Sequence, residues 1–197
     1  MLKLLLNLCL AGLLSISVAK AGDITGTVKA NGVRTPENAV IYIEKVEGKT
    51  FKPPEKHVMI DQKNMTFIPH VLPVIAGTTV DFHNSDDVMH NVFSPDKCAD
   101  KFNLGTWPKG ENRSYTFQNA GCRTTVLCNV HPEMEGYVVV LQNPYFAVSS
   151  KEGTYSIKNV PAGKYTLSIW HEKLKSKPVE IVVPETGSAN SDFVLDR

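Results

Sequence analysis

The stretch RTTVLCNVHPEMEGYVVVLQ, residues 123–142, contains two runs of alternating apolar and polar side chains on either side of a short loop. A period of two predicts half-buried β-strands. Pro132 cannot donate a backbone hydrogen bond to a sheet, so the first strand must end before it. Cys128, His131 and Met134 therefore lie at a strand end and in the loop that follows, where a tight turn can direct all three side chains to one spot.

The rest of the chain shows the same alternation of apolar and polar residues. Further runs that suit short strands lie at residues 23–32, 38–46, 77–85, 113–121, 153–160, 163–172, 178–184 and 191–197. The 12 prolines and 13 glycines fall mostly between the runs, and helical periodicity is almost absent. The sequence therefore predicts an all-β fold of sandwiches with Greek-key connections.

The N-terminus reads as a targeting segment. An apolar run from Leu4 to Val18 follows a lysine and precedes small residues in an A-x-A pattern that ends at Ala21. This pattern predicts a secretory signal peptide over residues 1–21. A membrane anchor is the alternative, but the run is shorter than the roughly 20 residues of a span, and no charged stop follows it. We expect a periplasmic or secreted protein with no membrane span after cleavage.

The cysteines support export. Removal of Cys9 with the signal peptide leaves Cys98, Cys122 and Cys128. An odd number of cysteines in an oxidising compartment suggests one disulfide and one thiol with another task. Cys122 and Cys128 begin and end one strand, about 20 Å apart, so we expect Cys98 to pair with Cys122. Two buried thiols are the alternative.

The net charge of +1 gives no basic surface for nucleic acid.

The middle of the mature chain and its flanks differ in amino-acid composition. Residues 50–143 contain all three of its cysteines and every histidine except His171. The flanks, residues 22–49 and 144–197, contain no cysteine and no methionine. This difference predicts one domain that carries chemistry and flanking segments that do not.

The flanks resemble a transthyretin-like, carboxypeptidase-regulatory-type β-sandwich in two pieces. GDITGTVKANG (22–32) and ENAVIYIE (37–44) resemble its first two strands, whereas KEGTYSI (151–157) and PAGKYTL (161–167) resemble its later ones. The acidic residue that leads the family's turn is shifted here to Glu152. The resemblance implies one discontinuous sandwich, 22–49 and 144–197, interrupted by an inserted domain. A single continuous sandwich with long edges is the alternative.

The short loop also carries metal-ligating side chains. A fourth donor, His90, comes from VDFHNSDDVMHNVFS, residues 80–94. Two imidazoles, a thiolate and a distant thioether are the ligands of a blue-copper electron-transfer site. Zinc also accepts Cys and His, but Met is a poor zinc ligand and the chain has no C-x-x-C pair.

The middle of the chain resembles a cupredoxin. The resemblance rests on AGTTVDFHNSDDVMHNVF (76–93) and on CNVHPEM (128–134), whose Cys-x-x-His-x-x-Met spacing is that of amicyanin. It implies that residues 50–143 form a Greek-key cupredoxin sandwich with one mononuclear type 1 copper ion. The implied copper ligands are His90, Cys128, His131 and Met134. Asn91 is implied as the residue whose side chain ties the two ligand loops together.

The cupredoxin resemblance implies an exported one-electron carrier. A redox partner, such as a c-type cytochrome or a dehydrogenase, would dock near His131, and Glu133 and Glu135 favour a basic partner surface. Copper handling without electron transfer is the alternative, although no tract rich in Met or His is visible. We do not expect an enzyme: a multicopper oxidase needs more histidines, and a cysteine hydrolase would leave Met134 unexplained.

The other candidate donors have simpler interpretations. We expect His70 to be a surface or capping residue, His83 to lie near a turn and His57 to be exposed. His171 is expected to be structural. Met89 directly precedes a ligand, so its side chain should point to the opposite face, where we expect it to pack in the core.

Overall fold

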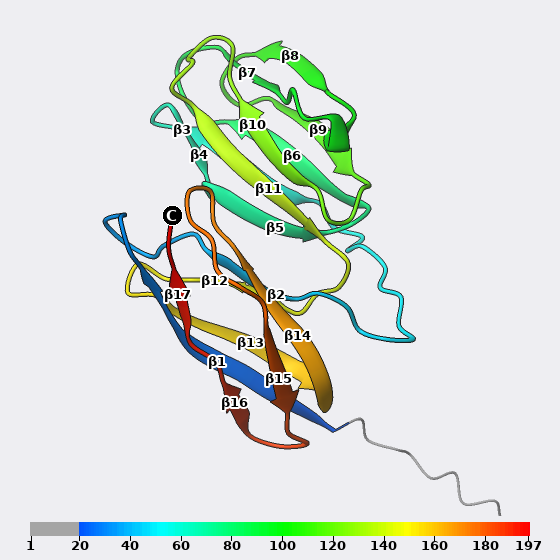
Figure 1. The fold of residues 1–197 in the computed structure, drawn as a ribbon. Helices are drawn as coiled ribbons and strands as arrows, with labels where there is room; N and C mark the ends of the chain where they lie inside the picture. The colour runs from blue at the N-terminus through cyan, green and yellow to red at the C-terminus, as the bar shows by residue number, and fades with distance from the viewer. Residues whose placement is uncertain (1–19) are drawn as a thin grey trace, which may run out of the picture.

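The computed structural model describes residues 20–197 and confirms an all-β protein (Figure 1). The predicted signal peptide falls almost wholly on residues 1–19, outside the described residues. Within residues 20–197, no helix is long and apolar enough to cross a membrane. The only helical element described is a 3₁₀ turn, η1 (Lys97–Ala99).

The middle of the chain forms a two-sheet sandwich. One sheet has the order β5-β11-β10-β7-β8 and the other β4-β3-β6-β9. The strands are β3 (Val58–Lys63), β4 (Thr66–Ile68), β5 (Val71–Ile75), β6 (Thr78–Asn84), β7 (His90–Phe93), β8 (Asn103–Trp107), β9 (Asn112–Phe117), β10 (Arg123–Leu127) and β11 (Glu135–Leu141). Alternation decides which side chains face inward: along β6, Thr78, Val80, Phe82 and Asn84 are all buried.

The two flanks share a second pair of sheets. Their strands are β1 (Ala21–Ala30), β2 (Val40–Ile43), β12 (Phe146–Val148), β13 (Thr154–Pro161), β14 (Gly163–Trp170), β15 (Val179–Val183), β16 (Ser188–Asn190) and β17 (Phe193–Leu195). β1 pairs with β13, β16 and β17, and the other sheet has the order β12-β2-β14-β15. Ile41 and Ile43 on β2 lie opposite Ile169 and Leu167 on β14. These strands enclose their own hydrophobic core, separate from that of the middle segment.

One glycine of the flank motif has a clear structural reason. Gly153 has φ of +87°, a left-handed conformation that glycine adopts without strain. A Cβ at this position would also overlap the carbonyl oxygen of Val28 on the neighbouring strand. The KEGTY turn therefore requires glycine so that β13 can pack closely against β1.

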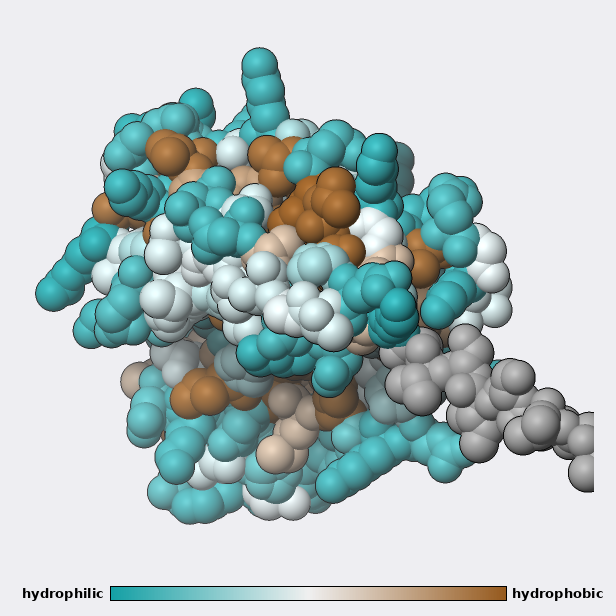
Figure 2. Space-filling view, turned by 90° about the horizontal axis from the view of Figure 1, so that it is seen from below, coloured by the Kyte–Doolittle hydropathy of each residue, from teal (hydrophilic) through white to brown (hydrophobic). Residues whose placement is uncertain are grey.

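The two sandwiches touch through a small apolar junction. Val40 of the flanking sandwich is buried with Val71, Val139 and Leu141 of the other. Figure 1 shows the two bodies stacked, and β5 and β12 are in contact across the junction. The face shown in Figure 2 carries its hydrophobic side chains in separate groups among hydrophilic ones, so no broad apolar surface covers this side.

The chain crosses the junction twice, through residues 44–57 and again through residues 142–145. Asn143 holds the second crossing next to the start of the first. Its side-chain Nδ2 donates to the carbonyl oxygen of Ile43, the last residue of β2, at 2.8 Å. The same side chain accepts a hydrogen bond from the backbone of Tyr145 at 3.1 Å. Asn143 is 1 % exposed, so water does not compete for these bonds.

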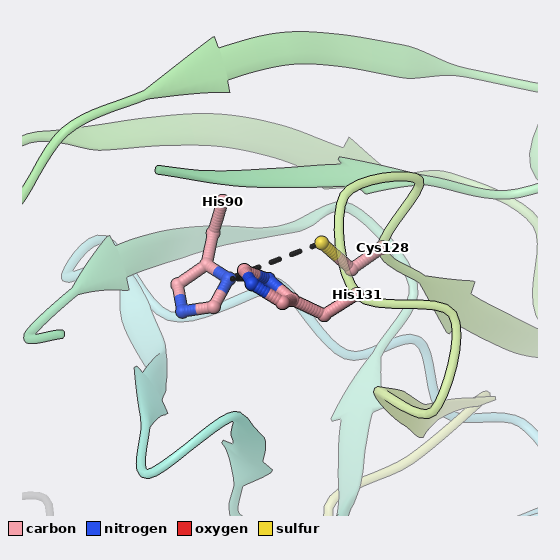
Figure 3. Close-up of side chains that lie close together, drawn as sticks. All are labelled: His90, Cys128 and His131. Carbon is pink, nitrogen blue, oxygen red and sulfur yellow. Dashed lines mark hydrogen bonds between the residues drawn. The ribbon is translucent and has the colours of Figure 1, made fainter. Parts of the chain in front are cut away.

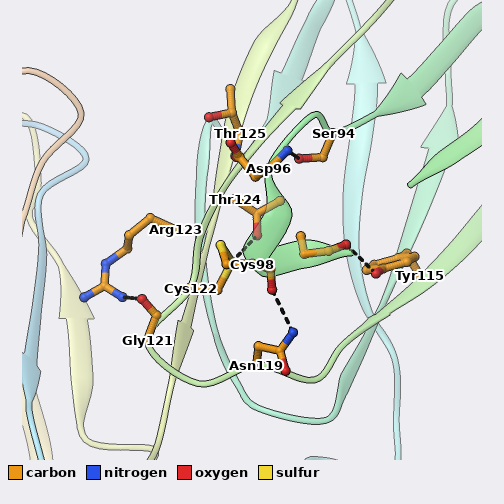
Figure 4. The surroundings of a disulfide bond; sticks show 11 residues. Ser94, Asp96, Cys98, Tyr115, Asn119, Gly121, Cys122, Arg123, Thr124 and Thr125 are labelled. Atoms are coloured by element: carbon orange, nitrogen blue, oxygen red, sulfur yellow. Dashed lines mark hydrogen bonds between the residues drawn. A yellow bond between two sulfur atoms is a disulfide. The ribbon is translucent and has the colours of Figure 1, made fainter. Parts of the chain in front are cut away.

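The structure joins Cys98 and Cys122 by a disulfide, the pair expected from the sequence (Figure 4). Cys98 lies in η1 and Cys122 lies directly before β10, with their Cα atoms 5.6 Å apart. Asn119 Nδ2 donates to the carbonyl oxygen of Cys98 at 2.7 Å and holds the turn in place. Cys128, at the other end of β10, is the free cysteine of the described residues, and it is buried.

Candidate metal centre

Three of the four expected ligands meet at one end of the middle sandwich (Figure 3). The Nδ1 atoms of His90 and His131 are 3.1 Å apart, and the Sγ of Cys128 lies 3.9 Å from His90 Nδ1. All the ligand atoms lie within 4.8 Å of one another. Among residues 20–197, no other group of three His, Cys, Asp or Glu side chains is this close.

Sheet topology explains this convergence. His90 begins β7 and Cys128 directly follows β10, and these strands are antiparallel neighbours with Leu127 opposite Phe93. Leu127 and Phe93 are the last residues of their strands, so beyond this pair the residues that follow Leu127 run antiparallel to those that precede Phe93. Cys128 therefore comes close to Asn91, whose backbone N–H lies 3.4 Å from its Sγ. The topology therefore brings together two residues that are 38 positions apart in the sequence.

Met134 closes the same loop. Its backbone N–H donates to the carbonyl oxygen of His131 at 3.0 Å, and the chain then enters β11, which pairs with β10. The pairing of Leu127 with Glu135 places the two ends of the loop next to each other. Met134 is 1 % exposed and belongs to the same buried cluster as Cys128. Its thioether is therefore held on the inner side of the ligand loop.

Asn91 connects the two ligand segments as expected. Its side-chain Oδ1 accepts a hydrogen bond from the backbone of Asn129 at 3.3 Å. Its Nδ2 donates to Asn103 Oδ1 at 2.9 Å and to the Gly105 carbonyl at 2.7 Å. The backbone N–H of Asn91 also points at the Sγ of Cys128, at 3.4 Å. One buried residue thus fixes the position of the thiol relative to β7 and β8.

Asp86 is a functional residue that the sequence analysis missed. The Nε2–H of the fully buried His90 donates to Asp86 Oδ2 at 2.9 Å. The same carboxylate accepts the backbone N–H groups of Asn64 at 2.7 Å and Met65 at 2.9 Å. With its Nε2 proton engaged, His90 presents the lone pair of Nδ1 towards Cys128 and His131, the orientation that a metal ligand needs. A carboxylate four residues before His90 was the available signal in the sequence.

The charge of Asp86 is maintained by these contacts. Burial opposes ionisation of the carboxyl group, but the hydrogen bonds from Met65, His90 and Asn64 outweigh it and hold the pKa of Asp86 below its usual value. Asp86 is therefore an anion at neutral pH. Its negative charge beside His90 favours a cation at the site.

The donor set fits copper. A buried thiol, two imidazoles and a thioether combine soft sulfur with nitrogen donors, which suits both Cu(I) and Cu(II). The three donors of Cys128, His90 and His131 already lie within a single ion's reach of one another. Met134 supplies the soft donor that a zinc site would not need.

The remaining histidines lie outside this group. His83 is half-buried on β6, and the exposed His57 interacts with Asp81 at 2.9 Å. His70 is not simply a surface residue, since its Nε2 lies 3.2 Å from Glu172 across the junction. The buried His171 accepts a hydrogen bond from the backbone of Lys173 at 3.1 Å, in line with a structural role.

The expected burial of Met89 is wrong. Met89 is 45 % exposed, whereas the adjacent His90 is fully buried. Met89 precedes β7 and lies in the loop at the end of the sandwich. At the end of the sandwich, His90 takes the inward-facing position, and the side chain of Met89 is left in solvent.

Comparisons with known proteins agree with this geometry. Residues 54–141 match the family model of copper binding proteins of the plastocyanin/azurin family. The family match, together with the clustered ligands, supports a cupredoxin domain in this segment and a copper-binding role. No match was found among curated proteins.

Several solved structures are similar to part of the chain. A Cu-containing nitrite reductase from Thermus scotoductus SA-01 is 26 % identical over 51 % of this chain, with a TM-score of 0.42. The match spans only 25 % of the nitrite reductase chain. A purple cupredoxin from Nitrosopumilus maritimus is 26 % identical, with 42 % of this chain and 98 % of that one covered and a TM-score of 0.38. A reduced amicyanin variant is 27 % identical, with 53 % and 99 % covered and a TM-score of 0.40.

Proposed function

We propose that the protein is an exported copper-binding electron-transfer protein with one mononuclear type 1 copper site. The observation that carries this proposal is the convergence of His90, Cys128 and His131 within 4.8 Å, with Met134 buried beside them. The proposed ligands are these four residues. The protein is proposed to act as a carrier and not as an enzyme.

The surrounding residues suit a site that must change little between two oxidation states. Bound copper supplies a one-electron Cu(I)/Cu(II) couple. Asp86 holds the ring of His90, and Asn91 fixes Cys128, so the donors are positioned before the metal arrives. The burial of Cys128 and Met134 keeps water from the sulfur donors. His131 is only half-buried and offers a short path from the site to a docked partner.

The proposed architecture is a cupredoxin domain, residues 50–143, inserted into a discontinuous transthyretin-like sandwich, residues 22–49 and 144–197. The pairing of β1 with β13 and of β2 with β14 supports it, because each pair joins strands from both sides of the inserted segment. The flanking sandwich is proposed to position the copper domain without chemistry of its own. The proposed location is the periplasm or the exterior, after cleavage of the signal peptide.

The proposed partner is a redox protein with a basic docking surface, such as a c-type cytochrome or a dehydrogenase. A cleft of about 600 Å³ opens beside the ligand loop, between the two sandwiches. Four carboxylates line it, those of Glu37, Glu133, Glu135 and Glu172. The cleft's one lysine, Lys173, is paired with Glu172 at 3.0 Å. This acidic lining supports a partner that presents lysine or arginine side chains.

Copper handling without electron transfer is a second candidate. It is favoured by two solvent-exposed methionines at the metal end, Met65 and Met89. A reversible one-electron couple with rapid exchange would support the carrier. Release of copper to an acceptor, without such a couple, would support handling.

An absorption spectrum of the Cu(II)-loaded protein tests the site. We expect an intense visible band from thiolate-to-copper charge transfer and one copper per chain. Cys128→Ser should abolish the band, because the thiolate is its source. Persistence of the band in this variant would show that the ligand assignment is wrong.

A further inference from the structure

Most methionines of the described residues are on the surface. In the described residues, Met59, Met65 and Met89 are 57 %, 48 % and 45 % exposed, and only Met134 is buried. Methionine usually packs in cores, because its long apolar side chain fills gaps there. Three exposed thioethers therefore call for an explanation other than packing.

Two of the three are linked to the proposed copper ligand His90, one through a shared carboxylate and one through the backbone. The backbone N–H of Met65 donates to Asp86 Oδ2 at 2.9 Å, and the Nε2–H of His90 donates to the same oxygen at 2.9 Å. Met89 directly precedes His90. One carboxylate thus holds the backbone of Met65 and the ring of His90 together, and Met89 is the residue next to His90. Met59 is on the solvent side of β3, opposite Asp81 rather than the ligand loop.

The turn that carries Met65 is held in a fixed conformation. Asn64 and Met65 have φ of 56° and 54°, a left-handed conformation that non-glycine residues rarely adopt. Asp86 accepts the N–H groups of both residues, at 2.7 and 2.9 Å, and so stabilises the turn. We call the exposed side chains around the ligand loop the rim. If Met65 were only one apolar side chain of this rim, its turn would not need to be held by hydrogen bonds.

The chemistry of the rim points to a particular ion. Other exposed apolar side chains at this end, Val88 and Val130 among them, have no donor atom. The thioethers of Met65 and Met89 are soft, uncharged donors, which favour Cu(I) over harder cations.

We propose that Met65 and Met89 form a Cu(I) entry site that captures the ion at the rim and passes it to the buried ligands. This inference rests on the proposed copper site. The transfer is a ligand exchange without oxidation or reduction: Cu(I) leaves the two thioethers, the Sγ of Cys128 bonds to it, and the thiol proton is released to solvent.

Loading kinetics of the apo protein test the transfer step. Cu(I) would be supplied from a soluble chelator, and chelator release and protein loading would be followed after mixing. Loading of the double variant Met65→Leu/Met89→Leu should be about tenfold slower, the change expected if capture at the rim is weakened by one order of magnitude. Final copper content, the charge-transfer band after oxidation and the potential should stay unchanged. Loading with Cu(II) should also be unchanged, because thioethers contribute little to its capture.

Met59→Leu is the matched control, since it removes an exposed thioether that lies away from the site. Equal Cu(I) loading rates in the wild type and the double variant would overturn the proposal. So would a loss that Met59→Leu reproduces. If the double variant loads normally but exchanges electrons more slowly with a partner, the rim is a docking surface and the proposal is also wrong. Absence of the charge-transfer band in the wild type would instead contradict the proposed copper site.

A direct binding measurement separates the rim from the inner site. In Cys128→Ser, titration with Ag(I), a redox-inert substitute for Cu(I), can be followed through ¹³C-labelled methionine methyl signals. The signals of Met65 and Met89 should shift at low Ag(I), and that of Met59 should not. Met134 reports any binding that remains at the inner ligands. Unchanged signals for Met65 and Met89 would refute the entry site.

Discussion

The cupredoxin segment and the flanking sandwich are built from the same kind of strands, yet they differ in how fully their buried polar atoms are hydrogen-bonded. The buried side-chain atoms without a hydrogen-bond partner are on Asp61, Gln62, Thr78 and Trp107, all in the cupredoxin segment. The flanking sandwich has none among its described residues. In it, buried Ser168 donates to Glu44 at 2.6 Å. The segment that carries the proposed metal ligands is thus also the one in which some buried polar atoms have no hydrogen-bond partner.

This difference separates stability from function within one chain. The flanking sandwich has an apolar core with satisfied polar groups, so substitutions there should change stability and leave the site intact. Substitutions near the ligands should change metal affinity and potential more than folding. Four substitutions and one pH series test whether stability and function are divided between the two regions in this way.

The largest effect is expected from the core of the flanking sandwich. Leu167→Ala removes a fully buried side chain and should lower the free energy of unfolding by about 2–5 kcal/mol. Val182→Ala, on the neighbouring β15 and 62 % exposed, should change it by no more than about 0.5 kcal/mol. Urea unfolding followed by circular dichroism and by the copper colour would compare the two regions. If the colour is lost together with the flanking sandwich, the two bodies unfold as one unit.

Asn91→Ala should have the next largest effect, and on the metal rather than the fold. It removes the bonds to Asn103, Gly105 and Asn129, so we expect copper affinity to fall about 10–100-fold. Competition with a chelator of known affinity would measure it. Asn119→Ala, which removes an asparagine near the disulfide, is the control. An affinity equal to wild type would show that Asn91 does not position the ligands.

Met134→Leu should keep the colour but raise the reduction potential. Loss of a weak thioether leaves fewer donors to stabilise Cu(II). A tenfold change in the preference for Cu(I) over Cu(II) corresponds to about 59 mV. Voltammetry would measure the shift, and a lower potential would argue against Met134 as an axial ligand.

Asp86→Asn should raise the potential by less than Met134→Leu. The amide oxygen can still accept the hydrogen bond from His90, but the negative charge that favours Cu(II) is removed. Asp87→Asn removes the same charge from a neighbouring side chain that is 89 % exposed, and its effect should be screened by water. Equal shifts in the two variants would mean that the contact with His90 has no special role.

The smallest effect is a pH dependence of the flanking sandwich. Burial lowers the pKa of His171 below its usual value of about 6.5. As pH falls below about 6.5, the unfolded chain takes up a proton that the folded chain still resists, so stability decreases. His171→Gln should flatten this decrease in urea midpoints measured between pH 8 and 5.

The sequence predicted those features that depend on local pattern. Alternation located the long strands, among them β6, β11, β13 and β14, because their two faces have different environments. The ligand loop was also readable, since Cys128, His131 and Met134 lie within seven consecutive residues. Three of the four strands of three residues, β4, β12 and β16, lie outside the predicted runs, because so short a strand does not show a period.

The missed features depend on contacts between distant segments. The role of Asp86 depends on the turn at Asn64 and Met65, which lies more than 20 positions away. The exposure of Met89 depends on where β7 begins, which alternation does not define for a residue in a loop. The bond between His70 and Glu172 spans 102 positions and exists only because the two sandwiches meet. Tertiary packing decides all three.

The double crossing between the sandwiches makes the protein tolerant of a single backbone cut. A protease that cleaved the crossing at residues 44–57 would leave residues 142–145 intact, and Asn143 would still hold the severed end at Ile43. The two fragments would also stay joined by the pairing of β1 with β13 and of β2 with β14. The nicked protein would therefore keep its proposed metal site on the flanking sandwich, and the break would become visible only after denaturation.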